Sequence, residues 1–168
     1  MGSTSASDKH PVGVIGAGSF GTAVANLLAE NGEVLFYSRR QEAVDIINTK
    51  RTNNGQTIHP TIRATSDLQE ITNNCYLLFP SVSSDSFRQV MQGMAPFLRP
   101  DHMMIHCTKG FDIKLEPGKT ILDKDIILKP SDIYTMSKVI LEETCVKRVG
   151  CMSGPNLARE IANQHPAA

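Results

Sequence analysis

Three glycines near the N-terminus have the spacing of a phosphate-binding turn. Gly16, Gly18 and Gly21 form a G-x-G-x-x-G motif directly after the apolar run Val12–Ile15. In this motif the first glycine makes a tight turn, the second lets a pyrophosphate approach the backbone, and the third allows a helix to pack closely on a strand. The N–H groups at the helix start would then bind the phosphates. The motif predicts dinucleotide binding, and the alternative is a glycine turn with a structural role only.

Two arginines bear on which dinucleotide is bound. The β-rich run Glu33–Tyr37 is followed by Ser38, Arg39 and Arg40. NAD-specific domains usually carry an acidic side chain at this place, where it holds the ribose 2′-hydroxyl. An arginine can instead pair with a 2′-phosphate, and no Asp or Glu is present here to repel that phosphate. We therefore expect NADPH to be accepted, although both arginines could also belong to a solvated helix start.

A lysine follows a later apolar run. Met103–Cys107 leads into Thr108-Lys109-Gly110, and ligands bind at such strand ends in open α/β sheets. Lys109 can offer a fixed positive charge to an anionic or carbonyl substrate. The alternative is an ordinary surface turn.

The Ser153-Gly154-Pro155-Asn156 segment is the third polar candidate. It follows the predicted strand Val146–Met152 and starts what we expect to be a helix. Its backbone N–H groups, hydroxyl and amide could bind a small polar ligand. Helix capping without a ligand is the alternative.

Strands and helices must alternate to bring these groups together. The runs expected to be strands are 12–15, 33–37, 62–65, 75–79, 103–107 and 146–152. Apolar residues at helical spacing lie between most of them. We expect 52–60 to be a polar loop, 111–129 to be irregular, and a helix to begin at Ser131 or Asp132. The sequence predicts an α/β, Rossmann-type doubly wound, mostly parallel sheet with helices on both faces.

Composition narrows the function classes. The chain has 168 residues, with 17 Lys plus Arg against 17 Asp plus Glu, so no basic field favours nucleic acid or an anionic membrane. It contains no run of about 18 apolar residues that could span a membrane. Four cysteines without a CxxC pair are interpreted as reduced thiols, which favours a cytoplasmic location. The histidines lack metal-ligand spacing, so we predict no metal site.

Taken together, the motifs resemble one family, the NAD(P)-dependent glycerol-3-phosphate dehydrogenases of bacterial type. The matching words are Gly16 to Ala23, Arg51-Thr52-Asn53, Ala64 to Leu68, Thr108-Lys109-Gly110 and Ser153 to Glu160. The sequence departs from the family pattern at Phe79–Ser84, where A-V-P-S is usual, and in a longer segment at 112–133.

The resemblance implies a set of site residues. Those expected at the cofactor, NADP or NAD, are Gly16, Gly18, Ser19, Phe20, Gly21, Arg39, Arg40, Lys109 and Ala158. Lys109 would also be catalytic and would contact the substrate, glycerol 3-phosphate or dihydroxyacetone phosphate, together with Gly154 and Asn156.

The resemblance also implies a domain organisation. Residues 1–10 are expected to be a disordered lead or tag, and 11–168 an NAD(P)-binding N-terminal domain. Family members continue into a helical substrate domain, so the chain is expected to be one half of an enzyme that is a homodimer at full length. Two other readings remain open at this point: a non-catalytic NAD(P)H-binding module, and another Rossmann reductase of the β-hydroxyacid type.

Overall fold

The structure, a computed structural model, describes residues 10–115, 118–123, 126–163 and 165. All but the last residue of the expected disordered lead therefore lies outside the described residues.

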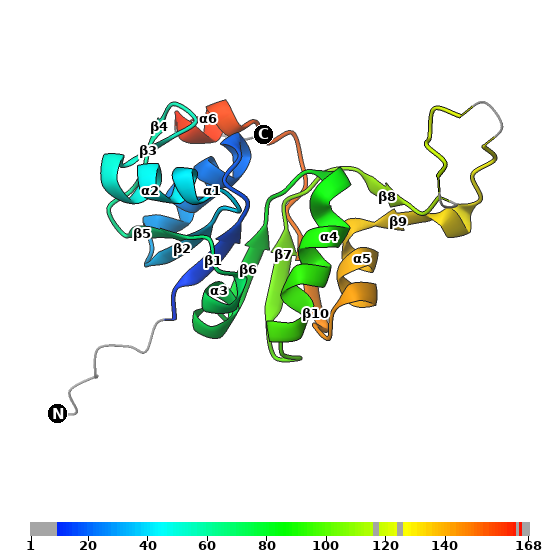
Figure 1. The fold of residues 1–168 in the computed structure, drawn as a ribbon. Coiled ribbons are helices and arrows are strands. Elements are labelled where there is room, and N and C mark those ends of the chain that lie inside the picture. The colour runs from blue at the N-terminus through cyan, green and yellow to red at the C-terminus, as the bar shows by residue number, and fades with distance from the viewer. Residues whose placement is uncertain (1–9, 116–117, 124–125, 164, 166–168) are drawn as a thin grey trace.

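A six-stranded parallel sheet forms the centre of the fold (Figure 1). In chain order its strands are β1 (Val12–Ile15), β2 (Val34–Tyr37), β5 (Ile62–Thr65), β6 (Leu77–Pro80), β7 (Met103–His106) and β10 (Arg148–Cys151). They lie side by side as β10-β7-β6-β1-β2-β5, and every pair is parallel. The chain first builds outward from β1 through β2 to β5, then returns to the other side of β1. The direction of winding therefore reverses between β1 and β6, which is where open α/β sheets bind their ligands.

Helices cover both faces of the sheet. On one face lie α1 (Ser19–Ala29) and α2 (Gln41–Lys50), and on the other lie α3 (Leu68–Asn74), α4 (Ser84–Met94) and α5 (Met136–Glu143). A short 3₁₀ helix, Ala95–Phe97, follows α4. The last helix, α6 (Ala158–Ala162), packs against α1 (Figure 1).

Alternation along the strands explains the two layers. Val14 and Phe36 point to the face of α1 and α2, whereas Ile15 and Leu35 point to the face of α3, α4 and α5, as the period of two in a strand requires. All four side chains are almost fully buried. The Rossmann-type doubly wound prediction is confirmed.

The predicted polar loop at 52–60 contains a small hairpin instead. Strands β3 (Thr52–Asn53) and β4 (Gln56–Thr57) pair antiparallel. Asn54 and Gly55, the two residues between them, have φ angles of 47° and 75°. Positive φ at both central positions is the backbone of the tightest hairpin turns, and Asn-Gly is the preferred dipeptide for it.

The segment expected to be irregular, 111–129, begins with a strand. Strand β8 (Phe111–Ile113) pairs antiparallel with β9 (Ile133–Thr135), so the segment is the start of a long hairpin. The prediction of a helix from Ser131 or Asp132 was also wrong. Pro130–Asp132 is a 3₁₀ turn, β9 follows it, and α5 begins only at Met136. The Thr135 hydroxyl caps α5 by accepting a hydrogen bond from the Lys138 N–H at 3.2 Å, which satisfies one of the free N–H groups at the helix start.

We expect Gly21→Ala to destabilise the fold strongly. A Cβ at Gly21 would overlap the carbonyl oxygen of Gly16, which is backbone and cannot rotate away. Such overpacking typically costs about 1–3 kcal/mol or more. Gly32→Ala is the matched control, because no atom lies within 4 Å of its added Cβ. Urea unfolding of both variants measures the difference, and equal stability would contradict this packing.

Candidate functional site

The glycine turn connects β1 to α1 and is packed against the end of β6. Gly16 has a φ of 114°, and a Cβ there would lie 2.7 Å from the carbonyl oxygen of Ser81. Its N–H donates to the carbonyl of Tyr37 at 3.0 Å. Gly18 differs from Gly16 and Gly21 because nothing lies within 4 Å of its Cβ position. The turn is therefore tightly packed at both ends and open at Gly18.

A cleft of about 370 Å³ opens beside this turn. Its walls are the turn itself, the residues after β2, the hairpin residue Asn54 and the start of α4. The described lining residues are Gly16, Ala17, Gly18, Tyr37, Ser38, Arg39, Arg40, Asn54, Ser81, Val82, Ser83, Ser86 and Val90. Both arginines are exposed and are the charged groups in this lining. We name it the arginine cleft.

A second cleft, of about 380 Å³, continues from the first. The two share Gly18, Ser81, Val82 and Ser83. The second is completed by residues from the helix start, the end of β7 and the segment after β10, namely Ser19, Phe20, Ser84, Cys107, Thr108, Lys109 and Asn156. Lys109 is the charged side chain in this described lining, so we name it the lysine cleft.

The turn after β7 holds Lys109 at the edge of the sheet. The Thr108 hydroxyl donates to the carbonyl of Val82 at 2.7 Å, and the Cys107 N–H donates to the carbonyl of Pro80 at 2.8 Å. Gly110 turns the chain with a φ of 109° and lies against Ser84. The backbone on both sides of Lys109 is thus fixed, while its side chain is exposed.

Two other groups near this turn are held in their neutral forms. Burial lowers the pKa of His106, whose Nε2 lies 2.9 Å from the Ser137 hydroxyl. Burial raises the pKa of the Cys107 thiol, and a thiol of raised pKa is a poor nucleophile. Lys109 therefore remains the group suited to charge chemistry in the lysine cleft.

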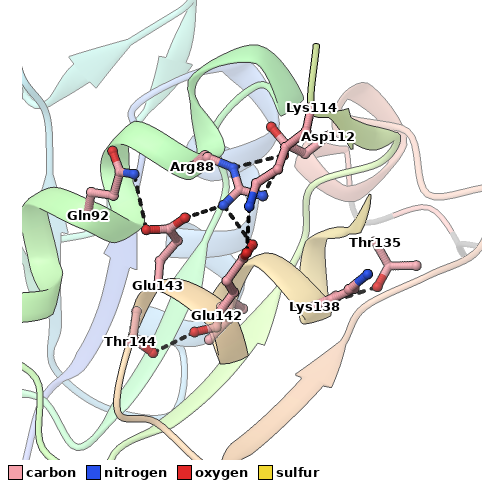
Figure 2. Close-up of polar contacts among 10 residues, drawn as sticks. Arg88, Gln92, Asp112, Lys114, Thr135, Lys138, Glu142, Glu143 and Thr144 are labelled. Carbon is pink, nitrogen blue, oxygen red and sulfur yellow. Dashed lines mark hydrogen bonds and ion pairs between the residues drawn. The ribbon is translucent and has the colours of Figure 1, made fainter. Parts of the chain in front are cut away.

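An ion cluster ties the chain that follows Lys109 to two helices (Figure 2). Arg88 of α4 donates through Nε and Nη2 to Asp112 of β8, at 2.8 and 2.7 Å. Its Nη1 contacts Glu142, at 2.8 Å, and also Glu143, both of α5. Hydrogen bonds from Lys114 and Arg88 lower the pKa of Glu142. Because Asp112 lies three residues after Lys109, the cluster fixes the exit of the lysine turn.

Tyr134 of β9 packs against the same cluster. Its ring lies 5.1 Å from the Arg88 guanidinium carbon and 3.8 Å from Lys138 Nζ, measured to the ring centroid. A cation over an aromatic face is favourable. The ring therefore adds cation–π contacts to the ion pairs that join α4, α5 and the long hairpin.

The structure brings most of the predicted site residues together, but not all. Gly16, Gly18, Arg39 and Arg40 line the arginine cleft, and Ser19, Phe20, Lys109 and Asn156 line the lysine cleft. Gly21 is buried beneath the turn, whereas Gly154 and Ala158 line neither cleft. Ser153–Asn156 does not start a helix either, because α6 begins at Ala158.

Sequence reasoning missed several lining residues. Val82, Ser83 and Ser84 follow β6, and Asn54 lies at the tip of the β3–β4 hairpin. The serines could have been found from their place after a buried strand next to β1. Asn54 is distant in sequence from every other lining residue, and no local signal brings it to the cleft.

A protein family described as the NAD-dependent glycerol-3-phosphate dehydrogenase N-terminus matches residues 11–168. The chain belongs to this family. The predicted family resemblance is therefore confirmed, and with it NAD or NADP as the cofactor.

Relatives in the family are much longer than this chain. A glycerol-3-phosphate dehydrogenase [NAD(P)+] of Pseudomonas aeruginosa strain LESB58 is 35% identical over 167 residues, which cover 96% of this chain and 44% of the relative. One from Pseudomonas fluorescens strain Pf0-1 is 37% identical and covers 92% and 40%. The crystal structure of glycerol-3-phosphate dehydrogenase from Coxiella burnetii superposes with a TM-score of 0.75 at 27% identity, covering 95% of this chain and 45% of that one. The chain thus spans less than half the length of these relatives.

The site residues fit a dinucleotide. Gly18 leaves open space where a pyrophosphate would approach, and the start of α1 presents N–H groups there. The Ser81 hydroxyl oxygen is buried in the wall shared by the two clefts, and apart from a contact with the Cys107 thiol it has no hydrogen-bond partner among the described residues. A ligand that offers hydrogen-bonding groups would satisfy it.

None of the helices in the described part of the chain has the length and apolar character needed to cross a membrane. Among the same residues, no three His, Cys, Asp or Glu side chains are grouped so that they could hold a metal ion.

We expect Arg88→Met to lower the free energy of unfolding by about 1.5–3 kcal/mol, because three carboxylates lose their shared donor. Arg99→Met is the control, since Arg99 forms one exposed ion pair with Asp101 at 3.3 Å and exposed pairs contribute about 1 kcal/mol or less. Urea unfolding measures both. Equal losses would show that the Arg88 cluster does not hold the turn.

Proposed function

We propose that the complete protein interconverts sn-glycerol 3-phosphate and dihydroxyacetone phosphate with NAD(P)(H), an activity that feeds glycerophospholipid synthesis. The observation that carries the proposal is the pair of connected clefts beside β1 and β6, where the strand order of the sheet reverses. Their shared wall is uncharged, with the arginines on one side and Lys109 on the other. That arrangement suits a ligand with phosphates at one end and a reacting group at the other.

The cofactor site begins at the glycine turn. Gly16 and Gly21 set the shape of the turn, Gly18 admits the pyrophosphate, and Ser19 and Phe20 supply N–H groups at the start of α1. Ala158 is included through the family resemblance, and its helix α6 packs against α1. When bound, the nicotinamide dinucleotide supplies or accepts the hydride.

Arg39 and Arg40 select the dinucleotide. Both line the arginine cleft directly after β2, where the adenosine ribose is held in Rossmann domains. An arginine there pairs with a 2′-phosphate through two parallel hydrogen bonds. NADPH is therefore accepted at this site.

Lys109 acts on the substrate. Its exposed side chain lines the lysine cleft, on a backbone fixed at Thr108 and Gly110. A fixed positive charge there stabilises negative charge that develops on the carbonyl oxygen of dihydroxyacetone phosphate. Asn156 lines the same cleft, and Gly154, with a φ of 130°, sets the backbone that leads to it. Both are assigned to substrate contact.

The chain is the nucleotide-binding half of the enzyme, 11–168, and is inactive alone. Hydride transfer requires the substrate to be held at a near-attack distance, and the substrate domain and a homodimeric assembly supply that in the complete protein. We assign it to the cytoplasm. All four cysteines are free, with Cys75 and Cys107 buried and Cys145 and Cys151 exposed, and free thiols are usual in a reducing compartment.

We expect Arg39→Ala to weaken binding of NADPH to this chain about tenfold, because charge-assisted hydrogen bonds to the 2′-phosphate are lost. Binding of NADH, which lacks that phosphate, should change by less than about twofold. Isothermal titration calorimetry at one salt concentration measures both, and Arg40→Ala shows which arginine faces the ribose. Equal weakening of the two cofactors would contradict the assignment of Arg39.

We expect Lys109→Ala to lower the kcat of the full-length enzyme about 100-fold or more, the typical effect of removing one group that stabilises developing charge. Its thermal stability should be close to that of wild type, because the Lys109 side chain is exposed. Lys147→Ala, an exposed lysine away from both clefts, is the control. Near-normal turnover of Lys109→Ala would remove Lys109 from the reaction.

A further inference from the structure

The β3–β4 hairpin lies against the outer side of the glycine turn. Asn53 and Asn54 both donate from Nδ2 to the carbonyl oxygen of Ala17, at 3.1 and 3.0 Å. Gln56 donates from Nε2 to the carbonyl oxygen of Ser19 at 3.0 Å. Three amide side chains from one hairpin thus bind two carbonyl groups of a turn more than 30 residues earlier in the chain.

The carbonyl group of Gly18, which lies between those of Ala17 and Ser19 in the sequence, is held as well. Thr22 binds the carbonyl oxygen of Gly18 through its N–H at 2.9 Å and its hydroxyl at 2.8 Å. Asn53 donates to the same hydroxyl at 2.8 Å. Three consecutive carbonyl groups, those of Ala17, Gly18 and Ser19, are therefore fixed directly or indirectly by the hairpin.

Fixing a carbonyl group also fixes the N–H group of the next residue. A trans peptide unit is planar, and its C=O and N–H bonds point in opposite directions. The N–H groups of Gly18, Ser19 and Phe20 must therefore point away from the groups that hold the carbonyls. Among the described residues none of these three N–H groups donates to a protein acceptor, as expected at a helix start.

The side chain of Gln56 holds the glycine turn although its own hydrogen bonding is incomplete. Its Oε1 atom is buried and has no partner among the described residues. A buried unsatisfied amide oxygen costs stability, so the side chain is not placed to stabilise the fold as well as possible. Its one hydrogen bond is the bond to the glycine turn.

We propose that Asn53, Asn54 and Gln56 are positioning residues for the dinucleotide site, which orient the N–H groups of Gly18, Ser19 and Phe20 toward the pyrophosphate. The proposal rests on the proposed function, because it assumes that the turn binds a dinucleotide. It adds a specific claim: the hairpin, which is distant from the glycine motif in sequence, sets how strongly the motif binds phosphate. Asn53 and Gln56 themselves line neither cleft; they act on lining residues through the carbonyl groups of Ala17 and Ser19.

Two neutral variants test the proposal in this chain. Asn53→Ala removes one of the two donors to the carbonyl of Ala17 and the donor to the Thr22 hydroxyl, and it leaves Asn54, which lines the arginine cleft, in place. Gln56→Met frees the carbonyl of Ser19 with a side chain of similar length. Neither variant adds a charge near the phosphates. The control is Asn48→Ala, which loses two hydrogen bonds to Ala64 at a position remote from both clefts.

The readout compares two probes by calorimetry. ADP-ribose contains the pyrophosphate, whereas adenosine 2′-monophosphate contains the adenosine and the 2′-phosphate without it. We expect each variant to weaken ADP-ribose binding about fivefold or more, the loss expected when a hydrogen bond of about 1 kcal/mol is removed. Binding of adenosine 2′-monophosphate should stay within about twofold of wild type. Asn48→Ala should leave both affinities unchanged while lowering the melting temperature.

The possible failures are distinguishable. If wild type binds neither ADP-ribose nor NADH, the proposed function itself fails. If wild type binds ADP-ribose and the variants bind it equally well, the positioning role is overturned while the proposed function stands. If the variants lose both probes equally, the hairpin only maintains the shape of the cleft, which also overturns the proposal.

Discussion

The close packing of the glycine turn against the end of β6 is the constraint on which the site depends. Gly16 contacts the Ser81 backbone, and Gly21 contacts Gly16, with no room for a Cβ at either position. This brings the start of α1 to the place where the strand order of the sheet reverses, between β1 and β6. Both clefts open there because β6 and β7 end beside the turn. The positions of Arg39 and Lys109 follow from the strands that precede them.

The parts of the fold that depend on local sequence could be predicted. The strand before Gly16 and the helix after Gly21 follow from apolar spacing and glycine chemistry, and so does the parallel order that a β-α-β unit imposes. The β8–β9 hairpin could not be predicted, because its strands are about 20 residues apart and no tight-turn signal joins them. Asn54-Gly55 is such a signal for β3–β4, although the polar composition of 52–60 predicts only a loop.

The candidate site likewise has residues that local sequence predicts and residues that it does not. Lys109 and Arg39 can be predicted because each lies within three residues of the end of a buried strand, so topology alone places them at one edge of the sheet. Asn54 and the ion cluster of Arg88, Asp112 and Glu142 depend on contacts between segments far apart in the chain. Such contacts are set by packing of the whole domain and leave no mark in local spacing. Ala158 is expected at the site from the resemblance alone, whereas Gly154 also belongs to a polar segment after a predicted strand; neither lines a cleft.

The distribution of charge along the clefts has a consequence for the role of ionic strength. The charged side chains are Arg39 and Arg40 in one cleft and Lys109 in the other, while the shared wall is Gly18, Ser81, Val82 and Ser83. Exposed side-chain charges are screened by salt over about 8 Å at physiological concentration. Hydrogen bonds from backbone N–H groups to a pyrophosphate in contact with them are screened far less. Rising salt should therefore first reduce the difference in affinity between NADPH and NADH. The part of the affinity that comes from the pyrophosphate, which both cofactors contain, should fall only at higher salt.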